Sequence, residues 1–231
     1  MKAAKRPIVK ICGLTRLEDA RLALELGADE LGFVLAPSPR RISPASAAAL
    51  VSELRSEGKK FRAIGVFVNE SPNAMREIME AVGLDAAQVH GDEGPGDCLP
   101  FAFPWYRALR PATAEEARRL ASAGWACPRL LAEAAQRGAY GGTGTRLSLE
   151  VALAARDATE ALGKEFFLAG GLGPGNVAEA VRAIGPAGLD LSSGVEEAPG
   201  IKSGAALRAF FEALRGAVAA PGAREGEHGA P

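Results

Sequence analysis

The sequence has few of the residues from which metal sites and disulfide frameworks are built. It contains only two histidines, His90 and His228, and three cysteines, Cys12, Cys98 and Cys127. An odd number of widely spaced cysteines indicates neither a disulfide framework nor a zinc knuckle. Two histidines so far apart do not suggest a histidine-rich metal site either. We therefore expect a protein without a metal cofactor.

The sequence also lacks a strong net charge, a basic stripe and long apolar runs. Its formal net charge is −1, which argues against a nucleic-acid partner. No stretch has the apolar length of a membrane span. The basic residues near the N-terminus are followed by an apolar run too short for the core of a signal peptide. These absences predict a cytoplasmic protein that binds neither membranes nor nucleic acids.

Short apolar runs alternate with helix signals along most of the chain. The expected strands span residues 7–12, 31–35, 63–68, 86–90, 105–109, 130–133, 166–169 and 189–191. Because these runs are apolar nearly throughout, both faces of the sheet should be covered, as in parallel sheets. The length of 231 residues and the apolar fraction of 48% favour a single-domain (β/α)8 TIM barrel, with an open doubly wound sheet as the competitor. We expect the barrel to occupy residues 1–218, and residues 219–231 to form a disordered tail.

Cap residues predict where several helices begin. The expected caps are Thr15, Ser43, Ser71, Thr113 and Ser148. Thr15 has Glu18 three residues later, which is a capping-box pattern. Pro174 predicts the start of the helix after the seventh strand.

Cys12 ends the first apolar run and is followed at once by Gly13. In barrels of parallel strands, catalytic residues lie at the carboxyl ends of the strands. A free cysteine is more often a small buried side chain than a reactive group. Its position at a strand end nevertheless favours a reactive thiolate, which could act as a base if nearby positive charge lowered its pKa.

Two further strand ends carry basic side chains. Arg40 and Arg41 follow the second strand, in a loop stiffened by three prolines. A guanidinium held in this way suits a carboxylate or a phosphate, and we expect one of the pair to bind it. His90 ends the fourth strand, where it could either support the rim or contact a substrate. Asn69 and Arg110, which follow the third and fifth strands, are expected to be structural.

Glycine-rich segments follow the last three strands. They are Tyr140-Gly141-Gly142-Thr143-Gly144, Gly170-Gly171-Leu172-Gly173 and Ser192-Ser193-Gly194. In (β/α)8 enzymes the loops after strands 7 and 8 commonly bind phosphate through backbone N–H groups. The sequence has no GxxxxGK[ST] motif, which argues against a P-loop nucleotide site. Together the segments predict a phosphate site at the barrel mouth.

Two acidic residues, Glu133 and Asp190, lie at or near strand ends. Glu133 would lie across the mouth from Cys12, where a protonated carboxyl could serve as a general acid. It could instead be an ordinary loop charge, and Asp190 could accept hydrogen bonds from backbone N–H groups under the phosphate loops. A base and an acid facing a phosphorylated sugar fit isomerisation by proton transfer, without a metal or redox cofactor.

Ordered motifs along the chain give it a family resemblance. They are Lys10-Ile11-Cys12-Gly13-Leu14-Thr15, Pro39-Arg40-Arg41-Ile42-Ser43-Pro44, Gln88-Val89-His90-Gly91-Asp92, the glycine segment at Gly141-Gly142, Ala169-Gly170-Gly171-Leu172 and Asp190-Leu191-Ser192-Ser193-Gly194. On these motifs the chain resembles phosphoribosylanthranilate isomerase of tryptophan biosynthesis, from about Ile8 to Lys202.

The resemblance implies a monomeric or homodimeric barrel that carries out a cofactor-free Amadori rearrangement. The substrate would be N-(5-phosphoribosyl)anthranilate and the product 1-(2-carboxyphenylamino)-1-deoxy-D-ribulose 5-phosphate. The family's catalytic cysteine corresponds to Cys12 as general base, and its loop arginine to Arg40 as partner of the anthranilate carboxylate. The phosphate would lie at the Gly170-Gly171 and Ser192-Ser193-Gly194 loops.

One departure from the family pattern concerns the general acid. The family usually has an aspartate before Tyr-Gly-Gly, whereas this chain has Leu130-Leu131-Ala132-Glu133. Either Glu133 replaces the aspartate, which we favour, or Ala132 does and the acid is missing. The alternatives are therefore a non-catalytic phosphate-binding barrel and an isomerase of another phosphorylated aminoaldose. The last is disfavoured because the first strand ends in Cys12 rather than an aspartate.

Overall fold

The computed structural model, which describes residues 6–99, 101–134 and 146–219, is built around a closed barrel of eight parallel strands. Each strand pairs with the next along the chain, and the last pairs with the first. The strands are β1 (Ile8–Cys12), β2 (Glu30–Val34), β3 (Arg62–Phe67), β4 (Ala86–Val89), β5 (Trp105–Leu109), β6 (Arg129–Ala132), β7 (Glu165–Ala169) and β8 (Gly188–Leu191). This closure confirms the (β/α)8 barrel and rules out the open sheet. The expected tail, 219–231, lies almost wholly outside the described residues.

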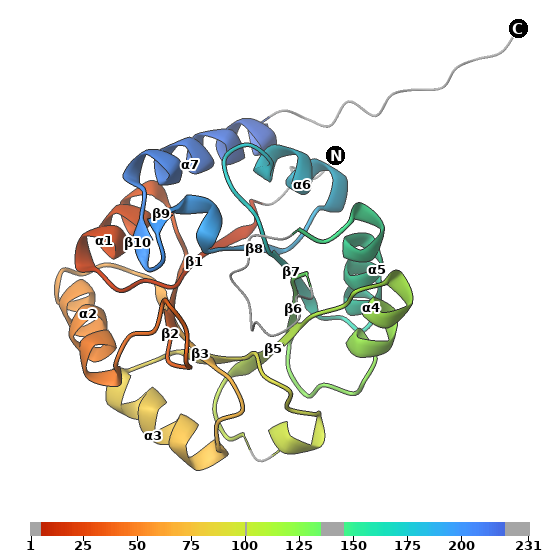
Figure 1. The fold of residues 1–231 in the computed structure, drawn as a ribbon, viewed down its shortest axis with the longest axis horizontal. Helices are drawn as coiled ribbons and strands as arrows, with labels where there is room; N and C mark the ends of the chain where they lie inside the picture. The colour runs from red at the N-terminus through yellow and green to blue at the C-terminus, as the bar shows by residue number, and fades with distance from the viewer. Residues whose placement is uncertain (1–5, 100, 135–145, 220–231) are drawn as a thin grey trace, which may run out of the picture.

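Helices form a ring around the strands (Figure 1). They are α1 (Leu17–Leu26), α2 (Pro44–Ser56), α3 (Pro72–Val82), α4 (Ala114–Ala121), α5 (Leu149–Glu160), α6 (Val177–Ile184) and α7 (Gly204–Ala219). Between β4 and β5 the described chain contains a short 3₁₀ helix, η1 (Gly96–Cys98). No described helix is both long enough and apolar enough to cross a membrane.

Four of the five expected caps are confirmed. Ser43, Ser71, Thr113 and Ser148 each accept a hydrogen bond from the backbone N–H three residues later. Thr15 is wrong as a cap, because its hydroxyl donates to the carbonyl of Gly200 at 2.6 Å instead.

The start of α6 also differs from expectation. The helix begins at Val177 rather than at Pro174. The Asn176 side chain accepts from the N–H of Gly173 at 3.0 Å and donates to the carbonyl of Gly171 at 2.8 Å, which fixes the turn before the helix.

The barrel interior holds an apolar layer above a charged one. The apolar side chains are Ile64, Ala86, Tyr106, Ala108, Leu131, Phe167 and Ala169. At the amino ends of the strands, Glu30, Arg62, Arg129 and Glu165 form what we call the floor cluster. Arg129 contacts both carboxylate oxygens of Glu30, at 2.8 and 2.9 Å, and its guanidinium carbon lies 3.7 Å from the ring centroid of Phe167.

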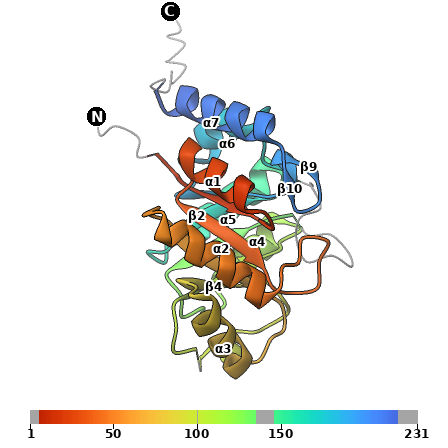
Figure 2. The ribbon, with the colours of Figure 1, turned by 90° about the vertical axis from the view of Figure 1, so that its left-hand side faces the viewer.

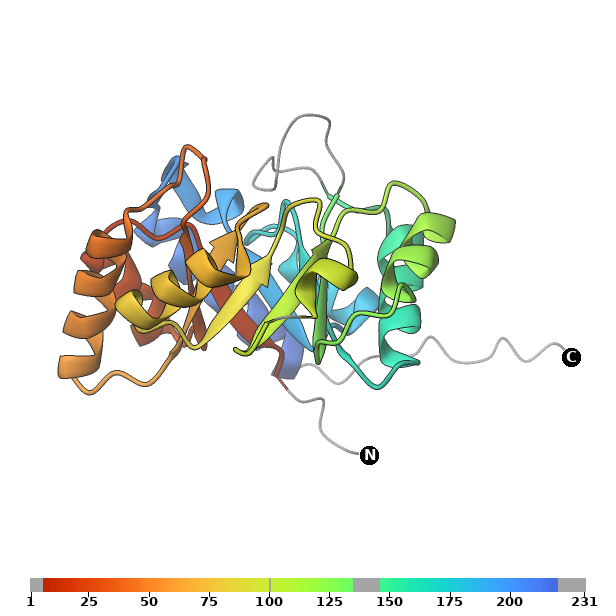
Figure 3. The ribbon, with the colours of Figure 1, turned by 90° about the horizontal axis from the view of Figure 1, so that it is seen from below.

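Two segments project from the opposite end of the barrel, which we call the mouth. They are the loop between β2 and α2 and the hairpin of β9 (Glu196–Ala198) and β10 (Ile201–Lys202). Figures 2 and 3 show the hairpin in blue and the loop in orange at the same end of the barrel. Arg40 in the loop and Glu196 in the hairpin form an ion pair, which ties the two segments together.

Candidate active site

Cys12 is the last residue of β1, and its side chain is buried at the mouth. Burial raises the pKa of the thiol, because it penalises the charged thiolate. Lys10 and Lys202 oppose this rise, whereas Asp190 adds to it. Nearby positive charge could have lowered the pKa of this thiol, but burial outweighs the two lysines. In the ligand-free protein the thiol is therefore held mainly in its neutral form.

Glu133 directly follows β6 and continues its pairing with β5. Its backbone N–H donates to the carbonyl of Leu109 at 3.1 Å, which extends the ladder by one residue. The side chain is 7% exposed, and its Oε1 lies 2.5 Å from Nε2 of His90. The carboxyl is therefore a fixed group of the mouth rather than an ordinary loop charge.

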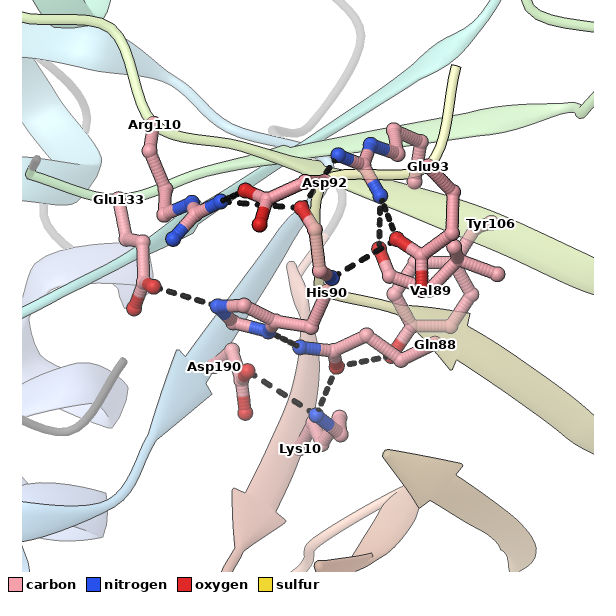
Figure 4. A network of polar contacts seen from close by, with 12 residues as sticks. Lys10, Gln88, Val89, His90, Asp92, Glu93, Tyr106, Arg110, Glu133 and Asp190 are labelled. Carbon is pink, nitrogen blue, oxygen red and sulfur yellow. Dashed lines mark hydrogen bonds and ion pairs between the residues drawn. The ribbon is translucent and has the colours of Figure 1, made fainter. Parts of the chain in front are cut away.

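His90 contacts protein groups through both ring nitrogens. Its Nδ1 lies 2.6 Å from Nε2 of Gln88, and its Nε2 faces Glu133 (Figure 4). Of the two roles that the sequence left open for His90, these contacts match support of the rim. The imidazole links the side chains of Gln88 and Glu133.

Lys10, Gln88 and Asp190 form a buried polar group beneath the mouth. The Lys10 ammonium donates to Gln88 Oε1 at 2.5 Å and to Asp190 Oδ2 at 3.0 Å. Asp190 therefore pairs with a lysine rather than with backbone N–H groups. Its other oxygen, Oδ1, is buried without a hydrogen-bond partner in the described chain. A buried polar atom in this state is available to a ligand.

Sequence reasoning missed Lys10 and Gln88 as members of the site, although a signal was present. Side chains two residues apart on a strand share a face. Lys10 precedes Cys12 by two residues, and Gln88 precedes His90 by two. The same alternation that directs Cys12 and His90 to the mouth therefore directs the two polar side chains into the barrel.

Arg40 lies in the mouth, held by Glu196. Its Nε and Nη2 donate to the two carboxylate oxygens at 2.8 to 3.0 Å, while Nη1 makes no hydrogen bond with a described residue. Arg41 is exposed. Of the two arginines, Arg40 is thus the one that is held in a fixed position.

Lys202 is the second basic partner of Glu196, and neither residue was expected from the sequence. Its ammonium donates to Glu196 Oε1 at 2.8 Å and to the carbonyl of Cys12 at 2.5 Å. Burial would raise the pKa of Glu196, but Arg40 and Lys202 outweigh it and lower the pKa. The hairpin therefore anchors both the end of β1 and the arginine.

The loops after β7 and β8 meet backbone to backbone. A Cβ atom built on Gly194 would lie 1.9 Å from the carbonyl oxygen of Leu172, so only glycine fits there. Gly170 and Gly171 have φ of 86° and 59°, in the left-handed region. The N–H groups of Gly171, Ser193 and Gly194 make no hydrogen bond with another described residue. Such amides can donate to an anion. Gly142, the other expected glycine, lies outside the described residues.

Asn69 and Arg110 fix the loop that follows His90. The Asn69 backbone N–H donates to Glu93 at 2.6 Å, and its side-chain oxygen accepts from the N–H of Asp92 at 2.7 Å. Arg110 donates to Asp92 at 2.9 Å. Both residues have the structural contacts that were expected of them.

Among the described residues, no three His, Cys, Asp or Glu side chains are grouped so that they could hold a metal ion.

Comparisons with known proteins show the family to which this chain belongs. The model of the N-(5'-phosphoribosyl)anthranilate isomerase family matches residues 9–213. The enzyme of that name from Myxococcus xanthus is 44% identical over 211 residues, which cover 90% of this chain and 95% of the relative.

Two solved structures of this family have the same fold. The phosphoribosyl anthranilate isomerase of Thermus thermophilus matches with a TM-score of 0.78 and 39% identity, over 90% of this chain and 98% of that one. Another, in complex with reduced 1-(o-carboxyphenylamino)-1-deoxyribulose 5-phosphate, matches with a TM-score of 0.77 and 32% identity, over 91% and 99%. The chain therefore belongs to the N-(5'-phosphoribosyl)anthranilate isomerase family.

Proposed function

We propose that this isomerase rearranges N-(5'-phosphoribosyl)anthranilate with Cys12 as general base and Glu133 as general acid. Glu133 gives a proton to the ring oxygen of the sugar, and the ring opens to an iminium ion. The Cys12 thiolate then removes the proton from C2′, which leaves an enolamine. A proton returns to C1′ and the 2′-hydroxyl loses its proton to become the ketone, so the product is an isomer of the substrate and no oxidant is needed.

The position of Glu133 carries this proposal. Its carboxyl is buried at the mouth and held by His90, on the side of the barrel away from β1 and Cys12. A base and an acid on separate sides of a bound sugar can exchange protons with different atoms of it. The raised pKa of Cys12 also makes its thiolate a strong base once the positive iminium ion favours ionisation.

The remaining groups of the mouth are proposed to bind the substrate. The N–H groups at Gly170, Gly171 and Ser192-Ser193-Gly194 would take the phosphate, and Gly142 stays a predicted contact. Nη1 of Arg40 would donate to the anthranilate carboxylate, since Glu196 uses the other side of the guanidinium. The unpartnered Oδ1 of Asp190 would accept from a sugar hydroxyl. His90 would hold the Glu133 side chain in place beside the substrate.

The two alternatives have less support. A barrel without its acid would have no carboxyl at the end of β6, whereas Glu133 holds one there. An isomerase of another aminoaldose is disfavoured by the cysteine at the end of β1. We also propose that residues 1–218 act as one catalytic domain in the cytoplasm. Whether the chain is a monomer or a homodimer stays a prediction.

Glu133→Gln tests the assignment. The amide keeps the shape and can still accept from His90, but it cannot donate an acidic proton. We expect kcat to fall about 10²- to 10⁴-fold with KM changed by less than about threefold. Turnover is followed by the fluorescence of the anthranilate adduct. Glu133→Asp is the matched variant and should retain more activity than the amide. Full activity of Glu133→Gln would overturn the assignment of the acid.

A further inference from the structure

A chain of hydrogen bonds crosses the barrel from Lys10 to Glu133. Lys10 lies on β1, Gln88 on β4 and Glu133 after β6, with His90 between the last two (Figure 4). The successive distances are 2.5 Å from Lys10 to Gln88, 2.6 Å from Gln88 to His90 and 2.5 Å from His90 to Glu133. All four side chains are buried.

Lys10 determines which way the amide of Gln88 faces. An ammonium group has three donors and no acceptor, so the amide atom beside it must be the oxygen. Burial alone would lower the pKa of Lys10, but Asp190 raises it well above its usual value and keeps the group charged. The hydroxyl of Tyr106 donates to the same oxygen at 2.9 Å. With Oε1 taken by these two donors, the NH₂ group of Gln88 faces His90.

The direction of the amide determines which nitrogen of His90 carries the proton. The Gln88 NH₂ group can only donate, so Nδ1 of His90 must accept and carries no hydrogen. In a neutral imidazole the single hydrogen is then on Nε2. Nε2 faces Oε1 of Glu133, so the imidazole donates to the carboxyl.

We propose that Gln88 is a positioning residue of the isomerase, which holds His90 in the Nε2–H tautomer so that Oε1 of Glu133 is always a hydrogen-bond acceptor. When Glu133 is protonated, as the proposed function requires, its acidic proton is carried by Oε2, which makes no hydrogen bond with a described residue. The role of that proton rests on the proposed function, whereas the tautomer does not.

The tautomer can be read directly, because the chain has only two histidines, His90 and His228. In a His228→Gln background, ¹⁵N-histidine labelling leaves His90 as the single reporter. We expect the ligand-free protein to show Nδ1 without a proton and Nε2 with one. A protonated Nδ1 would overturn the inference, and this measurement needs no change at Gln88.

Two variants of Gln88 then test its effect. Gln88→Glu replaces the donor by an acceptor, so we expect Nδ1 to gain a proton and kcat to fall about 10²-fold with KM little changed. Gln88→Met removes the donor without adding an acceptor and should also lower kcat. The matched control is Tyr106→Phe, which leaves Lys10 to direct the amide and should leave the tautomer unchanged.

The outcomes separate this inference from the proposed function. If Gln88→Glu moves the proton to Nδ1 but leaves kcat unchanged, Gln88 is not a positioning residue. If Glu133→Gln is inactive while His90 is protonated on Nδ1, the acid stands and the inference fails. If Glu133→Gln is fully active while His90 carries its proton on Nε2, the acid assignment fails and the assigned tautomer stands.

Discussion

The floor cluster and the mouth both place charged side chains inside the same barrel, but they differ in how completely these groups are paired and hydrogen-bonded. At the floor, Arg129 contacts both oxygens of Glu30, reaches Glu165 and lies over the ring of Phe167. At the mouth, Lys10 neutralises Asp190, yet one oxygen of that carboxylate has no partner among the described residues.

The difference separates stability from catalysis. A buried charge is costly unless it is paired and hydrogen-bonded, and the floor meets that condition for the described residues. Among the described residues, the mouth leaves an acceptor unpartnered, holds Cys12 mainly as a neutral thiol and gives the Glu133 side chain one hydrogen bond, from His90. In (β/α)8 barrels the carboxyl ends of the strands carry the active site.

Removing the thiol at the mouth should have the largest effect on activity. We expect Cys12→Ala to lower kcat about 10²- to 10⁴-fold, because the base that removes the C2′ proton is lost. The free energy of unfolding should change much less than activity, since the substitution removes a single buried sulfur atom. Steady-state kinetics and thermal unfolding measure the two effects.

Cys127 supplies the matched control for this comparison. It is also a buried thiol, but it lies just before β6, near the floor, and its sulfur contacts the carbonyl of Arg129 at 3.2 Å. Cys127→Ala should leave kcat within about twofold of the parent, since general-base catalysis is untouched. Equal losses in the two variants would contradict the separation of roles.

Removing a charge at the floor should lower stability and leave activity unchanged. Glu30→Gln leaves Arg129 buried without its main counter-charge, and we expect the free energy of unfolding to fall by about 3 kcal/mol. Turnover of the folded protein should be unchanged. Denaturant unfolding and kinetics on the same sample give both values.

A double substitution sharpens the result at the floor. Replacing both partners, Glu30→Met with Arg129→Met, removes the two charges together and should restore most of the lost stability. If the double variant is as unstable as the single one, then the stability of the floor depends on the ion pair itself rather than on the absence of an unpaired charge.

The features that could be predicted from the sequence are the local ones. The barrel followed from apolar runs and helix signals, and Cys12, His90 and Glu133 could be placed because each stands at a strand end. These are local features, so position along the chain is enough to find them.

Contacts across the barrel could not be predicted in this way. Arg129 meets Glu30 and Lys10 meets Gln88 only because the sheet closes and brings opposite strands together. Alternation shows that such side chains face the interior, but not which of them touch. Glu196 and Lys202 were missed for a related reason, since their hairpin folds back over β1 from the far end of the chain.

The pH dependence of thiol alkylation tests the state of Cys12. Burial raises the pKa of the thiol, so at neutral pH the free enzyme holds mainly the protonated form. Alkylation by iodoacetamide needs the thiolate, so its rate should rise about tenfold per pH unit while the thiol stays mostly protonated. The measurement uses a Cys98→Ala and Cys127→Ala background, in which Cys12 is the single cysteine. A rate that is already at its maximum at neutral pH would show that the thiol is not held in its neutral form.

The smallest expected effect comes from filling the space beside Cys12. A Cβ atom at Gly32 would lie 2.8 Å from Sγ of Cys12 and 2.9 Å from Cε of Lys10, so both side chains would have to shift. We expect Gly32→Ala to cost about 1–2 kcal/mol of stability and to lower kcat about fivefold through displacement of the thiol.

Gly216→Ala is the control, because Gly216 lies in α7 with no atom within 4 Å of an added Cβ. It should raise stability by about 0.5–1 kcal/mol and leave kcat unchanged. If Gly32→Ala loses stability but keeps full turnover, the position of the thiol tolerates a shift, and the mouth is less strictly arranged than the floor.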